Sequence, residues 1–238
     1  MSDSHDSSTS NPAPPPRTSV FLGVLAFAAV VAAQSFAIVT SPAEGDMGHL
    51  QKIMYVHVPA AWMAFVSFFI VLVFSVLYMA RRRENDDLVA ASAAEVGAMF
   101  TGLTLALGMI WGKPAWGVWW VWDARLTSTL VLFLIFVGYL SLRSFVDDPG
   151  QRARWSAAVG AIGAINVPIV YMSVKWWRTL HQPPSSPATL DSAYTMGLRL
   201  NAIAFLLVTI WFIRKRYEIA RLERGVENLA EAAAMEGK

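Results

Sequence analysis

The sequence predicts an all-α, polytopic membrane protein with six transmembrane helices, and three observations lead to this fold class. Of the 238 residues, 55% are hydrophobic and only 15% are charged, which is too apolar for an ordinary soluble domain of this length. Six uncharged runs come near the roughly 20 residues that cross a hydrocarbon core as a helix. Short polar loops separate these runs, so membrane spans explain them better than the helices of a buried soluble bundle do.

The six expected spans occupy most of the chain between residues 20 and 213. In chain order they cover residues 20–40, 56–80, 96–112, 126–142, 155–174 and 200–213. The last run is short, but it reaches about 20 residues when it begins near Ala193. We therefore expect one six-helix membrane domain over residues 20–213.

Polar segments flank this domain on both sides. Residues 1–19 are rich in Ser, Asp and Pro and have no apolar periodicity, which predicts a disordered cytoplasmic tail. Residues 214–238 are charged and rich in Ala. We expect them to form a cytoplasmic tail with a short helix at or near the inner membrane surface.

The distribution of Lys and Arg predicts the orientation of the spans, because cytoplasmic loops carry an excess of basic residues. With the N-terminus in the cytoplasm, the inner segments hold thirteen basic residues and the outer segments hold five, while Arg199 lies in or at the edge of the last span. Both termini are therefore expected inside (N-in/C-in). This orientation puts the loops before the second span, between the third and fourth spans, and before the last span on the outer side.

Composition excludes several kinds of chemistry. The chain has no cysteine, so it has no disulfide, no thiolate ligand and no Fe–S cluster. It also lacks a Gly-rich phosphate-binding loop, so any ATPase activity would belong to a partner subunit. Nothing in the outer segments has the pattern of a catalytic acid and base, and we expect a binding protein rather than an enzyme.

A tryptophan-rich segment, "WGKPAWGVWWVWDARLT" at residues 111–127, lies on the outer side between the third and fourth spans. Its tryptophans are Trp111, Trp116, Trp119, Trp120 and Trp122. Gly112 and Pro114 are expected to break the third span, with a short amphipathic helix starting at Pro114. On such a helix the last four indoles would share an arc of about 160° and form one aromatic face. An aromatic belt at headgroup level is the alternative, but four indoles on one arc favour a wide, flat, apolar ligand.

Two charged residues follow the tryptophans. Asp123 would lie within the aromatic face, and Arg125 would point to the far side of the same helix. A local ion pair or a charge at a helix end explains these two residues as well as a functional role does.

Two histidines on the same outer side suggest what the ligand is. His57 lies at the outer entrance of the second span, two residues before Pro59, and His181 lies in the last outer loop. Neutral imidazole is an axial ligand of haem iron, and porphyrin is flat and apolar, so these histidines beside a tryptophan platform suggest a bis-histidine haem site. His49 is a competing ligand on the same side, and each histidine could instead be a polar anchor or a hydrogen-bonded core residue.

Four cations on this side could pair with the propionates of haem. They are Arg125, Lys175, Arg178 and Arg199. Positioning at the membrane interface or snorkelling explains each of them at least as well.

The segment at residues 111–127 resembles the tryptophan-rich WWD signature of haem-handling membrane proteins. The stretches "YVHVPAAW" and "WWRTLHQ", which contain His57 and His181, resemble the two histidine segments of one family in this superfamily, CcmC, the C component of the cytochrome c maturation system. The resemblance covers residues 21–213, with six spans in the same order. The Pro-rich N-terminal tail and the proline-rich loop after His181 depart from the family pattern.

The resemblance implies a cargo, a site and partners. It implies that His57 and His181 are axial ligands of the iron of haem b, and that the WWD segment binds haem at the periplasmic face of the bacterial inner membrane. It also implies that haem passes to the haem chaperone CcmE. The expected further partners are the ABC transporter subunits CcmA and CcmB and the small membrane subunit CcmD.

Three functions compete for this sequence: a carrier that presents haem to a chaperone, a b-type electron-transfer subunit that keeps its haem, and a permease-like transporter subunit. Electron transfer predicts histidine pairs inside the spans, which the sequence lacks. A permease predicts polar residues lining several spans, and only Glu95 and Arg199 approach that description. Two axial imidazoles would leave no open position for oxygen chemistry, so we expect binding and presentation of haem rather than turnover.

Overall fold

The computed structural model describes residues 17–183 and 190–236, and these residues form a helical bundle. In chain order its elements are α1 (Arg17–Thr40), η1 (His49–Ile53), α2 (Met54–Arg81), α3 (Glu84–Trp116), α4 (Ala124–Phe145), α5 (Pro149–Ala164), α6 (Asn166–Trp176) and α7 (Ser192–Glu236). Within the described ranges, six helical segments are long and apolar enough to cross a membrane, with α5 and α6 together making one of them. The predicted all-α class is confirmed, and so is the presence of six helical segments with the length and composition of membrane spans.

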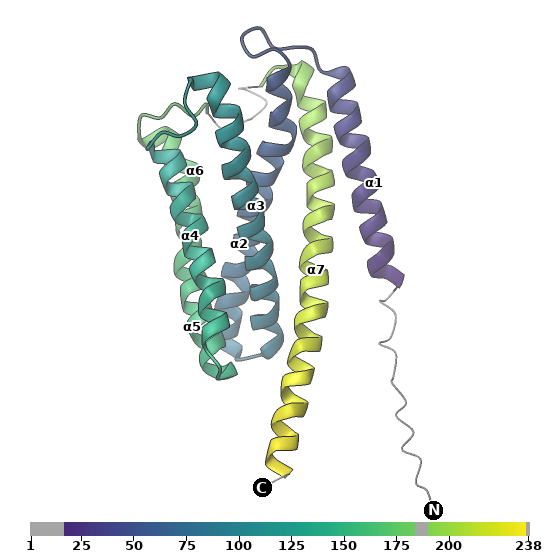
Figure 1. The fold of residues 1–238 in the computed structure, drawn as a ribbon, viewed down its shortest axis with the longest axis vertical. Coiled ribbons are helices and arrows are strands. Elements are labelled where there is room, and N and C mark those ends of the chain that lie inside the picture. Colours follow the sequence, from purple (N-terminus) through teal and green to yellow (C-terminus); the bar gives the residue numbers. More distant parts are fainter. Residues whose placement is uncertain (1–16, 184–189, 237–238) are drawn as a thin grey trace, which may run out of the picture.

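The helices lie side by side, with the paired helices α2 and α3 at the centre (Figure 1). The helices α4, α5 and α6 cover one side of this pair, and α7 covers the other, with α1 packed along α7. The beginning of α1 and the far end of α7 lie at the same end of the bundle (Figure 1). The connections that follow α1, α3 and α6 lie at the opposite end, so the tryptophan-rich segment and the segment carrying His181 are neighbours.

Small residues and stacked aromatics build the centre of the bundle. The Phe68 ring of α2 stacks on the Phe136 ring of α4, with centroids 3.8 Å apart. Gly97 of α3 gives the Phe68 ring its space, because a Cβ there would lie 2.5 Å from that ring. Outward-facing side chains such as Phe21 and Phe27 of α1 are instead largely exposed, as expected for helices that face lipid.

The fifth span is not one straight helix over residues 155–174, as the sequence predicts, but the two helices α5 and α6. They are separated at Ile165, which lies in a turn. Pro168 explains the break, because it has no N–H to donate to the carbonyl of Ala164, four residues before it, and its ring crowds that carbonyl. Helix α6 leads into the segment that carries His181.

The third span also differs from its prediction, because α3 runs through Gly112 and Pro114 and ends only at Trp116. The chain leaves the helix at Gly117, whose φ of 77° places it in the left-handed region that favours glycine. Residues 117–123 are not helical, and α4 begins at Ala124. The predicted short helix from Pro114 and its arc of four indoles are therefore wrong. A proline removes one hydrogen bond, and a helix with enough packing around it continues past that loss.

The last span continues without interruption into the charged tail, since α7 extends to Glu236. Ion pairs help to keep the first part of this extension helical and attached to the bundle, as far as Glu227. Arg214 pairs with Glu218 one turn later at 3.0 Å, and Arg152 of α5 reaches Glu227 of α7 at 3.0 Å. The predicted N-terminal tail lies mainly outside the described residues, and α1 already begins at Arg17.

Candidate functional site

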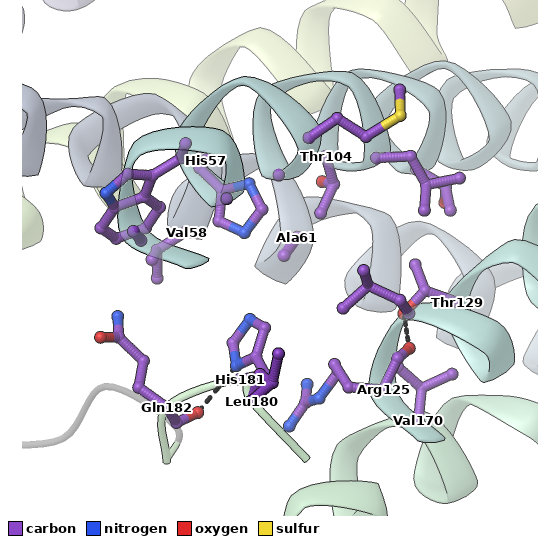
Figure 2. A pocket seen from close by; sticks show the side chains of 18 of the residues that line it. His57, Val58, Ala61, Thr104, Arg125, Thr129, Val170, Leu180, His181 and Gln182 are labelled. Atoms are coloured by element: carbon purple, nitrogen blue, oxygen red, sulfur yellow. Dashed lines mark hydrogen bonds between the residues drawn. The ribbon is translucent and has the colours of Figure 1, made fainter. Parts of the chain in front are cut away.

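A cavity of about 360 Å³ opens between α2, α3, α4 and α6 at the end of the bundle that carries the tryptophan-rich segment. His57 and His181 are among its lining residues. Figure 2 shows their rings on opposite walls, each with one ring nitrogen directed toward the other ring. The two histidines singled out from the sequence, 124 positions apart in the chain, therefore meet at one site.

Helix α2 holds His57 firmly, one turn from its first residue. The side chain is only 8% exposed, and its ring packs edge-on against Trp111 of α3 with centroids 5.7 Å apart. Helix α3 comes this close because Gly108 has no side chain, and a Cβ there would lie 3.3 Å from Cε1 of His57. The Nδ1 atom of His57 is buried and has no hydrogen-bond partner among the described residues.

The segment after α6 holds His181. Its Nδ1 lies 2.7 Å from the carbonyl oxygen of Gln182, and because a carbonyl only accepts, Nδ1 carries the proton and Nε2 keeps its lone pair. Burial lowers the pKa of His181 below its usual value of 6.5, the Gln182 hydrogen bond opposes this shift, and the nearby Arg125 adds to it. Burial thus favours the neutral ring, which is the form that binds a metal.

The separation of the two imidazoles suits one metal atom between them. Their centroids lie 6.5 Å apart, with 33° between the ring planes. A metal–imidazole bond of about 2 Å plus a ring radius of about 1 Å on each side gives a separation of about 6 Å. No group of three or more His, Cys, Asp or Glu side chains that could hold a metal ion is found in residues 17–183 and 190–236. Two histidines alone suit a metal that brings its other ligands with it, as iron in a porphyrin does.

The five tryptophans divide into two sets. Trp111, Trp116 and Trp120 line the cavity, and the Trp116 ring lies 6.5 Å from that of His181. Trp119 and Trp122 are 57% and 76% exposed and are not among the cavity residues that the structure describes. The indole N–H groups of Trp111 and Trp120 are buried and lack a partner in the described part of the chain, which leaves two donors available at the site.

Arg125 lines the cavity and does not point away from it, as a helix starting at Pro114 would require. It stands in the first turn of α4, where its guanidinium donates to the carbonyl of Tyr171 at 3.3 Å. Its Nε is buried without a partner among the described residues. The other three cations considered from the sequence, Lys175, Arg178 and Arg199, are exposed and lie outside the described lining, as does the exposed His49 of η1.

Asp123 is not part of the cavity wall that the structure describes. It caps α4, with Oδ1 accepting from the backbone N–H of Leu126 at 2.8 Å. Its Oδ2 accepts from the Thr179 hydroxyl at 2.5 Å and from the Leu180 N–H at 3.2 Å. Asp123 thus connects the tryptophan-rich segment to the segment that carries His181. The cap could have been inferred from an Asp before an apolar run, but its partners 56 and 57 residues away could not.

The sequence did not single out the residues that form the deeper part of the cavity. Three of them are threonines whose hydroxyl groups are used within their own helices. Thr101 and Thr104 of α3 and Thr129 of α4 line this part of the cavity. Each of their hydroxyls donates to the carbonyl four residues earlier in its own helix, at 2.7, 2.8 and 2.7 Å. These hydroxyls are therefore already paired within their helices, and the deeper wall presents a largely apolar surface to the cavity.

Comparisons with known proteins point to one family. A family model described as "CcmC: Heme exporter protein C" matches residues 14–231. The chain is 42% identical over 187 residues to "Heme exporter protein C" of Bradyrhizobium diazoefficiens, covering 76% of this chain and 71% of that protein. It is 37% identical over 187 residues to "Heme exporter protein C" of Escherichia coli, covering 77% and 76%. The protein of the same description from Paracoccus denitrificans is 36% identical over 188 residues, covering 76% and 78%.

Proposed function

Because this chain belongs to the CcmC family of haem exporter proteins, we propose that it binds haem b between His57 and His181 and presents it to the haem chaperone CcmE. The family assignment gives it a role in haem delivery for cytochrome c maturation and makes it a multi-pass membrane protein. The residues that hold the haem and the transfer to CcmE are the parts that we propose.

The observation that carries the proposal is that the imidazole rings of His57 and His181 face each other across the cavity, with their centroids 6.5 Å apart. A porphyrin brings four equatorial nitrogens to its iron, so two axial imidazoles complete the coordination. Such an iron has no open position for oxygen, which suits a protein that carries haem without using it in a reaction. An electron-transfer subunit that keeps its haem would hold its histidines along the spans, whereas the described histidines all lie at one end of the bundle.

The rest of the cavity matches the other parts of haem. Indoles such as Trp116 and Trp120 supply flat apolar surface for the macrocycle, and the deeper wall is apolar. Arg125 supplies a buried cationic donor with an unpartnered Nε, which suits a propionate. Trp111 and Trp120 add two further buried donors without partners among the described residues.

Transfer requires that a partner reach the haem. His181 stands on a short segment outside the helices, so its bond to iron is the easier of the two axial bonds for CcmE to replace by ligand exchange. The exposed Trp119 and Trp122 offer apolar surface beside the cavity for this partner. We assign the ABC transporter subunits CcmA and CcmB and the small subunit CcmD as the other partners. Any ATPase activity then belongs to a partner subunit, and this chain acts as a binding protein and not as an enzyme.

The basic residues support a periplasmic position for the site. Thirteen Lys and Arg residues lie in the segments expected inside and five in those expected outside, and a high basic count marks the cytoplasmic side. The site lies at the end of the bundle opposite the ion-paired extension of α7 (Figure 1). In the inner membrane, haem bound there faces the periplasm, where c-type cytochromes are assembled.

The absorption spectrum of the purified protein with haem tests the axial ligands. Wild-type protein should give a low-spin spectrum, because two imidazoles impose a strong ligand field. His57→Ala and His181→Ala should each shift the spectrum toward high spin, and both should fail to load CcmE. Added imidazole should partly restore the low-spin spectrum by occupying the vacated space.

The matched control is His49→Ala, which removes an exposed histidine at the same end of the bundle and should leave the spectrum unchanged. A low-spin spectrum that survives both His57→Ala and His181→Ala would show that the iron is held elsewhere, and the proposal would then be wrong.

A further inference from the structure

The segment that carries His181 lacks the support that a helix gives to His57. Helix α6 ends at Trp176, and residues 177–183 form no helix or strand. An axial ligand must nevertheless stand within about 0.5 Å of its productive position. Something outside this segment must therefore hold it in place.

The carboxylate of Asp123 provides that support. Its Oδ2 accepts from the Thr179 hydroxyl at 2.5 Å and from the Leu180 N–H at 3.2 Å. The hydroxyl oxygen of Thr179 in turn accepts from the backbone N–H of His181 at 3.0 Å. A continuous chain of hydrogen bonds thus runs from the first turn of α4 to the backbone of the ligand.

The direction of these hydrogen bonds requires a carboxylate. An ionised carboxylate only accepts, and three donors converge on Asp123: the N–H groups of Leu126 and Leu180 and the hydroxyl of Thr179. Because Thr179 uses its one proton toward Asp123, its oxygen lone pairs remain to receive the N–H of His181. An amide at position 123 would turn an NH₂ group toward at least one of these donors.

The ring of His181 is oriented by the same segment. With Nδ1 donating to the Gln182 carbonyl at 2.7 Å, the unprotonated Nε2 is the nitrogen left to point at His57 (Figure 2). The backbone position set by Thr179 and the ring orientation set by Gln182 together place that lone pair.

We propose that Asp123 is a positioning residue, which acts through Thr179 to hold His181 at the distance from His57 that a single iron requires. This inference rests on the proposed function, and it changes the expected role of Asp123. We expect Asp123 to act on the haem indirectly, by setting the position of His181, rather than by contacting the haem.

Two substitutions break the hydrogen-bond chain at different points. Thr179→Val removes the hydroxyl and leaves the cap of α4 intact. Asp123→Ser keeps a side chain that can cap α4, but its single oxygen cannot also reach Thr179 and Leu180. With haem added to the full-length proteins, both variants should show a mixture of low-spin and high-spin haem and should lose haem to apomyoglobin about tenfold faster than wild type.

Conservative and combined variants separate positioning from a merely structural role. Thr179→Ser retains the hydroxyl and should behave like wild type. The Asp123→Ser/Thr179→Val double variant should lose haem no more than about twice as fast as the Asp123→Ser variant, because Asp123→Ser already breaks the hydrogen bond to Thr179. Imidazole should restore the low-spin spectrum in each variant, since His57 remains in place.

The outcomes distinguish this inference from the proposed function. If His181→Ala removes the low-spin spectrum but Thr179→Val keeps the wild-type spectrum and rate of haem loss, the positioning role is overturned and the ligand assignment stands. If the fold-increase of the haem-loss rate in the double variant equals the product of the two single fold-increases, the positioning role is also overturned, because Thr179 would then act independently of Asp123. If wild type shows no low-spin haem, the proposed function itself fails.

Discussion

At the residue scale, the contact between α3 and the His57 ring depends on Gly108. A Cβ on Gly108 would lie 3.3 Å from Cε1 of His57, which is closer than a comfortable carbon–carbon contact of about 3.5–4.0 Å. The ring would have to move by a few tenths of an ångström. Because the ring is buried against Trp111, it cannot move freely in response.

Gly108→Ala should therefore weaken haem binding without unfolding the protein. A ring forced off its rotamer costs about 0.5–1.5 kcal/mol, which corresponds to about a two- to twelvefold loss of affinity. Titration of the protein with haem measures this loss. Gly138→Ala is the control, because a Cβ at Gly138 of α4 meets no atom within 4 Å. Equal affinities for both variants would mean that the close approach of α3 does not set the position of His57.

At the scale of elements, the tryptophan-rich segment has an inner and an outer face. Trp116 and Trp120 line the cavity, while Trp119 and Trp122 are exposed. The ring of Trp122 meets that of Trp120 edge-on at 5.5 Å, so the outer indoles also pack against the inner ones. The two faces should have separable roles in haem retention and in transfer.

We expect Trp116→Ala and Trp120→Ala each to speed the loss of haem by about two- to tenfold, since an aromatic contact contributes about 0.5–1.5 kcal/mol beyond its buried area. The Trp119→Ala/Trp122→Ala variant should retain haem like wild type but transfer it to CcmE more slowly. Haem capture by apomyoglobin measures retention, and loading of purified CcmE measures transfer. Rapid loss of haem from the Trp119→Ala/Trp122→Ala variant would contradict the separate roles of the inner and outer tryptophans.

A polar contact between spans holds α1 to the bundle. The Gln34 amide of α1 donates to Asn201 of α7 at 2.7 Å, and the Asn201 amide donates to the Ala33 carbonyl at 3.2 Å. Asn201 is fully buried. In a membrane such interhelical hydrogen bonds are expected to contribute about 0.6 kcal/mol each, and up to about 1.7 kcal/mol.

Asn201→Leu should accordingly lower the free energy of unfolding by about 1–2 kcal/mol in detergent, as measured by denaturation of the purified protein. Thr209→Val is the control, because the Thr209 hydroxyl bonds only to the Phe205 carbonyl of its own helix among the described residues. The haem spectrum of folded Asn201→Leu protein should match wild type, since the site is built on α2, α3, α4 and the segment after α6. No loss of stability would mean that the hydrogen bonds of Asn201 to Gln34 and Ala33 do not contribute to holding α1 in place.

At the scale of the whole molecule, two loops separated by an odd number of spans are expected to lie in opposite compartments, so the two ends of the bundle should face opposite sides of the membrane. Reporter fusions after Arg83 and after Arg216 should read cytoplasmic, and fusions after Gly45 and after Gly117 should read periplasmic. The reason is the excess of basic residues in the expected inner segments. A cytoplasmic reading after Gly117 would put the haem site on the wrong side for delivery to CcmE.

The helices show where sequence-based prediction succeeds and where it fails. The number and order of the spans follow from apolar runs of sufficient length, because each span enters the bilayer largely on its own composition. Helix ends are less predictable: α3 continues past Pro114 and ends at Gly117, while α5 ends near Pro168. Whether a proline ends a helix depends on the packing that remains around it, which local sequence does not describe.

By itself the sequence determined the all-α class, the six spans and the residue types from which a haem site could be built. Those properties follow from local composition and from the chemistry of single side chains such as His57 and Trp116. Only the tertiary structure decided which of these side chains share a cavity, that Arg125 faces it, and that Asp123 reaches Thr179 across 56 residues. These relations depend on how helices pack and where the chain leaves them, and distances of a few ångströms between remote segments are fixed only when all the spans are in place.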